Sequence, residues 1–442
     1  MSSEVTAHTH ADVLDHPISR WRQWSVTGIV LLFVVVSWAD KSILGIVAQP
    51  VMKELGLTAA QFGFLASSFS FLFSITALLG GIIADRFALR WVLFTLAILW
   101  SLTALPVLIT ASFGALLVSR IALGAAEGPA TPVAHAFTYT WFPNNQRGFP
   151  SAVLTSGASI AKIALGPVLA LIVAGFGWRA GFATLGLIGV LWCCAWLVVG
   201  RPGPFGAGSE QAQGPLTDQE PVAVSRIPLT RVAMTGTFIG LMVAYFVQYS
   251  LVMVVLTWLP SYFSQVWGLS TVQSGSLLGL PSITGMAGVL LMGAVTDRML
   301  RRGVTSRRAR GVLGGVVVLV GGIALLLIPF SPRPAFGLVL LLIGYGFSSA
   351  LQAICNPAIA EIVPAGQRGS ALGLLVAIGS LGGVFAPWLT GAILDAADSA
   401  AAGYGNAFQV FGAMLVLGGA LCWWLVNPER DAARLANSGY PK

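Results

Sequence analysis

The chain has 442 residues, of which 56% are hydrophobic and only 9% are charged, and its mean hydropathy is +0.84. Soluble domains typically carry about 25% charged residues, so this composition excludes an ordinary water-soluble protein. The apolar residues also occur in runs of about 20, the length that crosses a bilayer as a helix. The sequence therefore predicts an all-α membrane protein with many transmembrane helices.

Twelve apolar segments follow one another along the chain. The first six are predicted as helices at 23–49, 61–84, 91–110, 113–141, 149–176 and 180–199, and the last six at 233–264, 273–296, 311–330, 335–361, 368–395 and 405–426. The stretch between them contains RPGPFGAGSEQAQGPLTDQEP, a composition that cannot bury a core and predicts a flexible linker. We expect tails at 1–22 and 427–442, six-helix halves at 23–199 and 233–426, and a linker at 200–232.

Lysine and arginine residues are unevenly divided between the two sets of loops. Most of the 24 lie in the tails, the linker and the loops on the same side, whereas the opposite loops contain only Lys53, Arg179 and Arg333. Cytoplasmic loops carry the excess of Lys and Arg, so we expect a multi-pass protein of the inner (cytoplasmic) membrane with both termini cytoplasmic. The net charge of +8 then reflects topology and lipid contact and does not indicate a nucleic-acid-binding protein. The first twenty residues lack an apolar core, which predicts no cleaved signal peptide.

Short motifs recur in both halves. GIIADR at 81–86 has a counterpart in GAVTDR at 293–298, and PNNQRG at 143–148 in PAGQRG at 364–369. The GGIIADRFALR stretch resembles the loop motif between helices 2 and 3 of the major facilitator superfamily, although Ala88 stands where that family usually has glycine. The resemblance implies two pseudo-symmetric six-helix halves that alternate access around a central site. It also implies a gating role for Gly81, Asp85, Arg86, Arg90, Asp297 and Arg298.

Five ionisable residues fall inside the predicted spans: Asp40, Lys41, Arg120, Glu127 and Lys162. A charge at the bilayer centre costs about 2.5–3.5 kcal/mol on insertion scales, so each of them is a functional hypothesis. Arg120 and Glu127 are seven positions apart and share one helix face, whereas the adjacent Asp40 and Lys41 must turn to different neighbours. The three bases exceed the two acids, and protonation of the acids increases that excess. Such a site binds an anion better when it is protonated, which predicts proton-coupled anion transport.

Four separate segments resemble the anion:cation symporter family, which includes bacterial sugar-acid permeases, sialin and the vesicular glutamate carriers. They are RIALGAAEGPATP at 120–132, the pair at 40–41, GWR at 177–179 and TWLPSY at 257–262. The resemblance implies that Asp40 and Glu127 carry the coupling proton and that Lys41 contacts the substrate carboxylate. It also implies that Arg120 pairs with Glu127 or another acid. Lys41 departs from the arginine common in that family, and Lys162 lies outside its expected pattern.

Polar side chains in the seventh and tenth spans extend the candidate substrate site, which comprises Lys41, Arg120, Lys162, Gln248, Tyr249 and Asn356. Structural alternatives remain for several residues. Glu127 could serve only as a partner of Arg120, Asp40 as a hydrogen-bonding group between helices, and Lys162 as an interhelix contact. Lys41 could extend towards the membrane surface. His135 is either a proton relay or a structural histidine. Trp38, Trp141 and Trp258 could serve as interfacial anchors instead of contributing to the site.

The sequence contains no Walker loop, GxSxG elbow, HExxH motif or metal-ligating cluster, which argues against an enzyme. We expect neither a metal nor a cofactor, and we expect the proton to be the coupling ion. We expect a secondary transporter that works as a monomer and imports a small organic anion with protons. Sugar acids, aromatic acids and dicarboxylates are all compatible with a site that has excess positive charge. The alternatives are an anion exchanger or exporter of the same fold and, more distantly, a membrane sensor that binds without transport.

Overall fold

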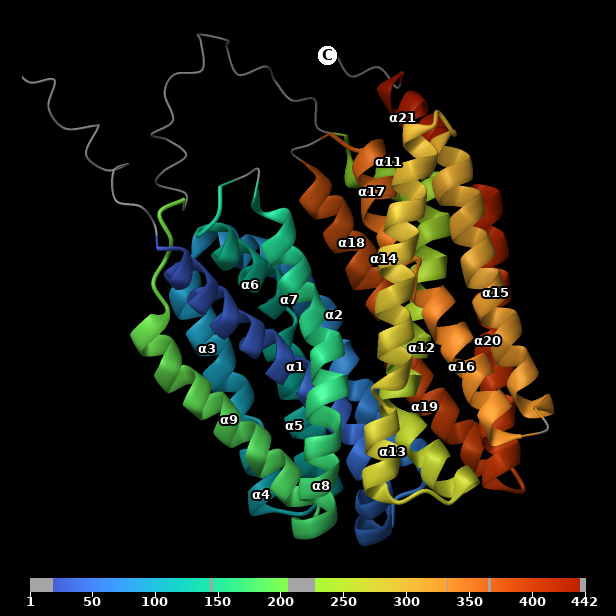
Figure 1. Ribbon diagram of the computed structural model, residues 1–442. Coiled ribbons are helices and arrows are strands. Elements are labelled where there is room, and N and C mark those ends of the chain that lie inside the picture. The colour runs from blue at the N-terminus through green and yellow to red at the C-terminus, as the bar shows by residue number, and fades with distance from the viewer. Residues whose placement is uncertain (1–18, 144–145, 206–226, 332, 365–366, 438–442) are drawn as a thin grey trace, which may run out of the picture.

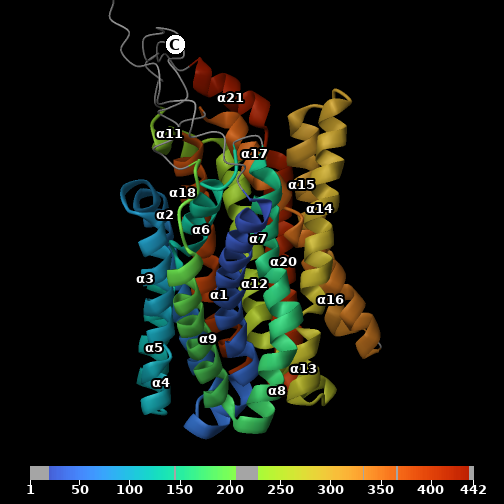
Figure 2. The same cartoon turned by 60° about the vertical axis from the view of Figure 1, so that its left-hand side comes forward.

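The protein is described by a computed structural model that covers residues 19–143, 146–205, 227–331, 333–364 and 367–437, although the side chains of a few residues near Asp85 are not described. These ranges form helices and contain no strand (Figure 1). The expected tail at 1–22, apart from its last four residues, and most of the expected linker lie outside them. The long helices run along one common axis in both ribbon views (Figures 1 and 2), which confirms the predicted all-α fold.

The described part of the first half contains ten helical segments in chain order. They are α1 (Arg20–Leu55), α2 (Ala59–Arg86), α3 (Leu89–Leu102), α4 (Leu105–Ile109), α5 (Phe113–Glu127), α6 (Ala130–Tyr139), α7 (Gly148–Ile160), a π-helical segment (Ala161–Leu165), α8 (Gly166–Phe176) and α9 (Trp178–Val199).

The second half repeats this arrangement and adds short helices at its two ends. Its segments are α11 (Leu229–Ala233), α12 (Gly236–Trp267), α13 (Thr271–Leu277), α14 (Leu280–Arg301), a π-helical segment (Arg307–Val312), α15 (Leu313–Leu327), a 3₁₀ turn (Ile328–Phe330), α16 (Pro334–Ser349), α17 (Gln352–Ile362), α18 (Arg368–Ser380), α19 (Gly382–Asp395), α20 (Ala400–Leu425) and α21 (Pro428–Ala436). Both α11 and α21 lie at the end of the bundle where α1 begins (Figure 1), which we call the terminal end.

Eleven stretches of the described chain are long and apolar enough to cross a membrane. The predicted span at 113–141 is absent from this set because it is divided into α5 and α6 at Gly128 and Pro129. Proline lacks the N–H that would continue the α-helical hydrogen bonds, so neither piece reaches spanning length alone. With this interrupted helix the described chain has the expected twelve spans. The predicted boundary of the first span was too narrow, because α1 extends from Arg20 to Leu55.

The two halves approach each other most closely away from the terminal end. Gly45 of α1 lies so close to α12 that an added β-carbon would collide with the carbonyl group of Leu256. Gly63 of α2 has the same relationship to the carbonyl group of Pro387 in α19. Only a residue without a side chain allows backbones to pack at this distance. These glycines therefore close the bundle at the end opposite the termini.

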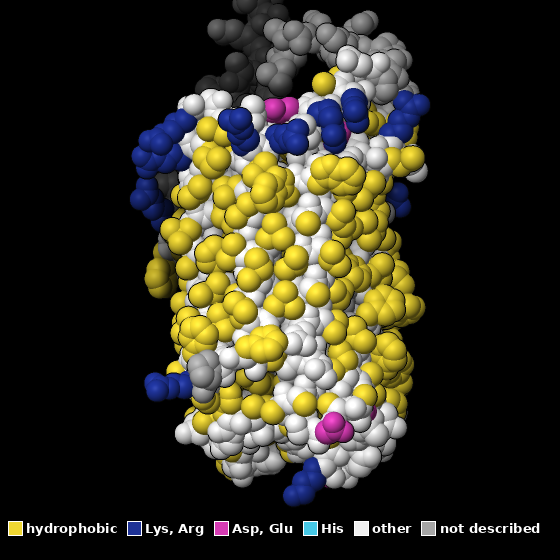
Figure 3. Space-filling model, turned by 90° about the vertical axis from the view of Figure 1, so that its right-hand side faces the viewer, with side chains coloured by type: hydrophobic (Ala, Val, Ile, Leu, Met, Phe, Trp, Pro, Cys, Tyr) yellow, Lys and Arg dark blue, Asp and Glu magenta, His cyan; other side chains and the backbone are white. Residues whose placement is uncertain are grey.

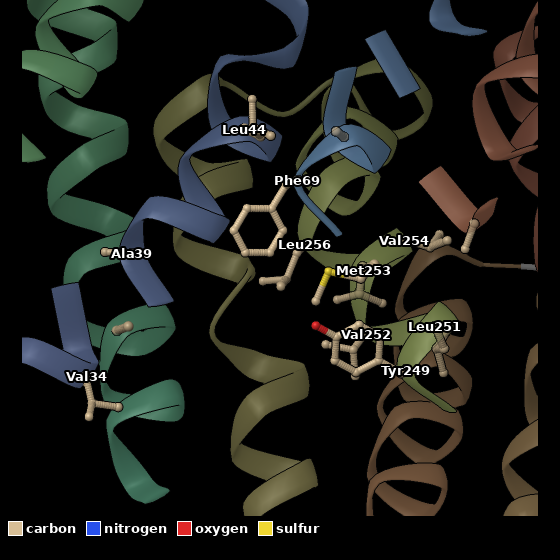
Figure 4. Packing of buried hydrophobic residues seen from close by; sticks show 14 of the residues in the cluster. Val34, Ala39, Leu44, Phe69, Tyr249, Leu251, Val252, Met253, Val254 and Leu256 are labelled. Atoms are coloured by element: carbon tan, nitrogen blue, oxygen red, sulfur yellow. The ribbon is translucent and has the colours of Figure 1, made fainter. Parts of the chain in front are cut away.

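Apolar side chains continue this closure towards the middle of the molecule. Figure 4 shows the ring of Phe69 in α2 directed towards Leu256 and Met253, which come from α12. All three are at least 94% buried. Deeper still, the hydroxyl groups of Ser74 and Ser380 lie 2.7 Å apart and join α2 to α18.

A carboxylate reinforces the contact between the halves at the closed end. Asp395, the last residue of α19, accepts hydrogen bonds from the backbone N–H groups of Ala59 (2.9 Å) and Ala60 (2.7 Å) in the first turn of α2. A negative charge at a helix N-terminus is favourable because of the free N–H groups and the helix dipole. Asp395 therefore caps a helix of the other half, which the sequence analysis did not identify.

Positively charged side chains gather at the terminal end. Figure 3 shows a band of Lys and Arg above a broad apolar belt, on the face that carries the second half. Lys53, Arg179 and Arg333 lie at the opposite ends of their helices, as the alternation of loops predicts. This distribution is the one that the positive-inside rule requires if the terminal end is cytoplasmic.

We predict that Asp395→Ala weakens the closed end. Loss of a capping carboxylate costs about 0.5–2 kcal/mol, and here that cost falls on the contact between the halves. In a background without the four native cysteines, spin labels at the exposed positions Lys53 and Ala401 should then show an additional population at longer distance. Asp398→Ala, at an exposed carboxylate three residues further on, should leave the distribution unchanged. An unchanged distribution in Asp395→Ala would contradict this role.

Candidate functional site

A buried ion pair joins the first two elements of the candidate site. The ammonium group of Lys41 in α1 pairs with the Glu127 carboxylate at the end of α5, and their side chains are 7% and 0% exposed. Lys41 also donates to the hydroxyl group of Ser37 at 3.0 Å and lies 4.9 Å from the centre of the Trp38 ring. This geometry excludes the alternative in which Lys41 extends towards the membrane surface, because its charge is already neutralised within the bundle.

Arg120 and Asp40 form the second part of this cluster. Arg120 is 1% exposed, donates to the backbone carbonyl of Asp40 at 3.3 Å and stacks over Phe182 at 5.2 Å. It lies close enough to Asp40 and Glu127 to attract both carboxylates electrostatically. Even so, Arg120 Nε and Asp40 Oδ2 have no hydrogen-bond partner among the described residues. Buried polar groups are normally satisfied, so this cluster retains unused capacity for a proton or a ligand.

The pairing within the cluster differs from one expectation. Arg120 and Glu127 share a helix face, yet Glu127 forms its ion pair with Lys41 and not with Arg120. The reason is that the long side chain of Lys41 extends from α1 to the carboxylate at the end of α5. The alternative that Glu127 is only a structural partner of Arg120 does not match this arrangement.

Lys162 lies in the π-helical segment between α7 and α8. It is 5% exposed, and its ammonium group lies 3.4 Å from the hydroxyl oxygen of Tyr345 in α16 and 5.5 Å from the centre of the Trp38 ring. Both lysines therefore lie near the Trp38 ring inside the bundle, which contradicts the alternative that Trp38 is an interfacial anchor. We call Asp40, Lys41, Arg120, Glu127 and Lys162 the buried charge cluster.

Trp141 and Trp258 are likewise not anchors exposed at an interface. Both are buried, with 4% and 1% of their surfaces exposed, and both donate through Nε1 to backbone carbonyl groups. A tryptophan N–H needs a partner when it is buried, and each of these finds one between helices. Their function in the fold is to join elements.

Two of the three polar candidates from the second half are buried in the bundle. Gln248 is 1% exposed, and neither atom of its amide group has a hydrogen-bond partner among the described residues. Tyr249 is buried, stacks on Tyr245 with ring centres 6.1 Å apart and lies near enough to Glu127 for an electrostatic interaction. Asn356 is exposed in α17, and none of the described contacts connects it to the cluster.

Among the expected gating residues, the described side chains of Arg86, Arg90, Asp297 and Arg298 show no ion pair between the halves. Arg86, Asp297 and Arg298 are exposed. Arg90 donates to the carbonyl group of Leu197 in α9 at 2.8 Å, within the same half, and does not pair with an acid across a gate. The reason is that the halves meet at the opposite end. The side chains of Gly81 and Asp85 lie outside the described part of the chain.

His135 does not join the buried charge cluster. Its Nδ1 lies 3.0 Å from the carbonyl oxygen of Thr131 within α6, and its ring packs edge-on against Tyr139. These contacts fit the structural alternative. No group of three His, Cys, Asp or Glu residues in the described ranges could hold a metal ion.

Two residues of the site were missed in the sequence. Ser37 lies four positions before Lys41 on the same helix face, and this spacing could have identified it as a partner. Tyr345 gives no such signal, because it stands in an apolar run and meets Lys162 only through the packing of α16 against the first half.

A bundle of duplicated helical halves that closes at one end, with ionisable groups buried at its middle, defines the class of secondary transporters. The Major Facilitator Superfamily matches residues 29–353 and 345–440, and the chain belongs to this superfamily.

Curated relatives of the chain transport small organic anions. It is 30% identical to a hexuronate transporter of Bacillus subtilis (strain 168), with 83% of this chain and 87% of the relative covered. It is 28% identical to a probable sulfoacetate transporter of Cupriavidus necator (88% and 90% covered) and 26% identical to a D-galactonate transporter of Escherichia coli (87% and 91% covered).

Solved structures confirm the fold. A bacterial homolog to the human lysosomal transporter Spinster, in an inward-facing and occupied conformation, matches with a TM-score of 0.77 at 18% identity, covering 96% of this chain and all of that one. A D-xylose-proton symporter matches with a TM-score of 0.73 at 18% identity, covering 92% and 99%.

We predict that Glu127→Ala destabilises the detergent-solubilised protein, because it leaves the buried Lys41 ammonium group unpaired, at a cost of about 3–5 kcal/mol. The double variant Lys41→Met/Glu127→Gln removes both charges and should recover most of the apparent melting temperature. The exposed pair of Glu54 and Arg179 provides the control, since Glu54→Gln should cost at most about 1 kcal/mol. If Glu127→Ala had the same apparent melting temperature as the parent protein, the ion pair would not contribute to the stability of the fold.

Proposed function

We propose that this protein imports a small organic anion together with protons across the cell membrane, with its terminal end in the cytoplasm. The observation that carries the proposal is the buried pair of Lys41 and Glu127, which a proton can open. A carboxylate that neutralises a buried ammonium group can do so only while it is ionised. Protonation of Glu127 therefore frees a positive charge in the middle of the bundle.

The freed charge is the expected binding site for an anion. With Glu127 protonated, Lys41 keeps its hydroxyl partner Ser37 and its place over Trp38, but its charge is no longer compensated. An anionic group then replaces the carboxylate as its partner. When Glu127 loses the proton again, it competes for Lys41 and favours release. Proton and anion thus bind with positive linkage.

Asp40 is the second proposed proton acceptor. Its Oδ2 has no hydrogen-bond partner among the described residues, and its carboxylate lies within electrostatic range of Arg120, which donates to the backbone carbonyl of the same residue. The positive charge of Arg120 favours the ionised form of either carboxylate. It therefore favours loss of the coupling proton at the end of each transport cycle. The two carboxylates allow one or two protons per transported anion.

The second half contributes residues that make binding depend on both halves. Gln248 offers a buried amide group without a hydrogen-bond partner among the described residues, and Tyr249 lies within electrostatic range of Glu127. We propose both as contacts to polar groups of the substrate, and Asn356 as a contact at the terminal side. An anion held between the halves favours their rearrangement, which must break the closed end at Gly45, Gly63 and Asp395.

The relatives support an organic anion as the substrate. They are named for hexuronate, sulfoacetate and D-galactonate. We also propose that the protein works as a monomer, since each chain contains both halves and the complete cluster. Exchange of two anions without net proton movement is the second candidate function, because the same Lys41 site serves both modes.

We predict that Glu127→Gln abolishes proton-driven accumulation and retains exchange. The amide cannot carry the coupling proton, but it leaves Lys41 available for the anion. The measurement is uptake of a labelled acid into proteoliposomes under a pH gradient, compared with counterflow into vesicles preloaded with the same acid. The control Glu54→Gln lies at an exposed position and should transport normally. Accumulation by Glu127→Gln equal to that of the parent would remove Glu127 from proton coupling, and Asp40→Asn would then be tested alone.

A further inference from the structure

Lys162 is a buried cation whose charge is not compensated. Four ion pairs join described residues elsewhere, at Lys41, Arg179, Arg310 and Arg430. Lys162, by contrast, is 5% exposed and contacts only the hydroxyl group of Tyr345 and the rings of Trp38 and Tyr345 among the described residues. Neutral partners of this kind reduce the desolvation free energy of the buried ammonium group, but they do not neutralise its charge.

The backbone holds Lys162 in a fixed position. Its π-helical segment ends just before Gly166 and Pro167, and the proline cannot donate the hydrogen bond that would continue an α-helix. Across the halves, a β-carbon on Gly279 would lie only 3.0 Å from Ile163 Cα. Single π-helical turns inside α-helices occur frequently at functional sites, and here the wide turn places the ammonium group between the two halves.

Lys41 and Lys162 form two ends of one site. The ammonium groups lie 4.9 and 5.5 Å from the centre of the same Trp38 ring, so their separation is at most the sum of these two distances. This span fits a compact molecule with an anionic group at each end. One end would lie in the first half beside Glu127, and the other would meet Tyr345 of the second half.

The charges of the cluster agree with such a ligand. With all five groups ionised, the three bases exceed the two acids by one positive charge. One proton on Glu127 raises the excess to two, and a dianion then cancels it completely. A monoanion would leave one uncompensated positive charge in the low-dielectric interior, which is unfavourable.

We infer that the protein selects dianions, such as dicarboxylates, sugar diacids or carboxylate–sulfonates, by holding one anionic group at Lys41 and the other at Lys162 with Tyr345. This inference rests on the proposed function and narrows its substrate class. Lys162 acts as the specificity-determining residue, and each dianion enters with one proton.

The test compares matched acids at pH 7 with the full chain in proteoliposomes. Glucarate is paired with gluconate, and succinate with butyrate, so that each pair differs by one carboxylate. Binding is measured by competition, and transport by proton entry. We expect the parent protein to prefer the dianion of each pair.

Lys162→Gln should lower affinity for the dianion by roughly 10- to 100-fold, the usual effect of losing a charge-assisted hydrogen bond, and leave affinity for the monoanion unchanged. Lys162→Arg should restore the preference, and Tyr345→Phe should weaken it modestly. Lys53→Gln removes an exposed lysine and serves as the control.

Two binding results would overturn the inference: equal affinity of the parent protein for both members of each pair, or a dianion preference that Lys162→Gln leaves intact. If Lys162→Gln fails to fold, the inference is still tested by whether the parent protein and Lys162→Arg prefer the dianion of each pair. Proton entry with gluconate and butyrate as strong as with their dianions would contradict the inference but leave the proposed function standing. Failure of every acid to drive proton entry would contradict the proposed function itself.

Discussion

The low dielectric of the bundle interior requires that every buried charge be compensated, and the cluster around α1 and α5 meets this requirement only in part. Glu127 neutralises Lys41, and Asp40 lies beside Arg120, but Lys162 has only neutral partners among the described residues. A structure with one positive charge in excess has a permanent attraction for anions. Because the compensating groups are carboxylates, a proton changes that attraction. The proposed coupling of proton and anion follows from this single imbalance.

The buried charge cluster lies where the second half approaches the first, so ligand binding there can affect how the two halves move. Tyr345 of α16 contacts Lys162, and Tyr249 of α12 lies within electrostatic range of Glu127, so the second half adjoins the cluster at both residues. Away from the terminal end, the halves meet through glycines and the Asp395 cap, contacts that require close backbone approach. Such contacts are lost together when the backbones separate. A ligand that strengthens the contacts at the middle can therefore compensate for breaking those at the closed end.

The fold could be predicted almost completely from the sequence, because lipid imposes long apolar helices and a one-sided charge distribution. The differences lie in the span at 113–141, where Gly128 and Pro129 divide the helix, in the longer first helix α1, and in the short helices α11 and α21 in the expected linker and tail. The site could be predicted as a set of buried charges, but not as a set of pairs. Helix periodicity placed Arg120 and Glu127 on one face, whereas in the folded protein the side chain of Lys41 from α1 forms the ion pair with Glu127. Contacts between distant elements depend on tertiary packing that local patterns do not encode. Examples are the approach of Lys162 to the Trp38 ring and the hydrogen bond from the first turn of α2 to Asp395.

Proton movement linked to an anion is the most direct test of these relationships. The measurement is internal pH in proteoliposomes that contain a pH-reporting dye, after sugar acids, aromatic acids and dicarboxylates are added outside one at a time. We expect acidification with one class of acid and none without protein. With folded protein, no acidification by any acid, together with rapid exchange when the same acids are preloaded, would contradict proton symport and favour an anion exchanger.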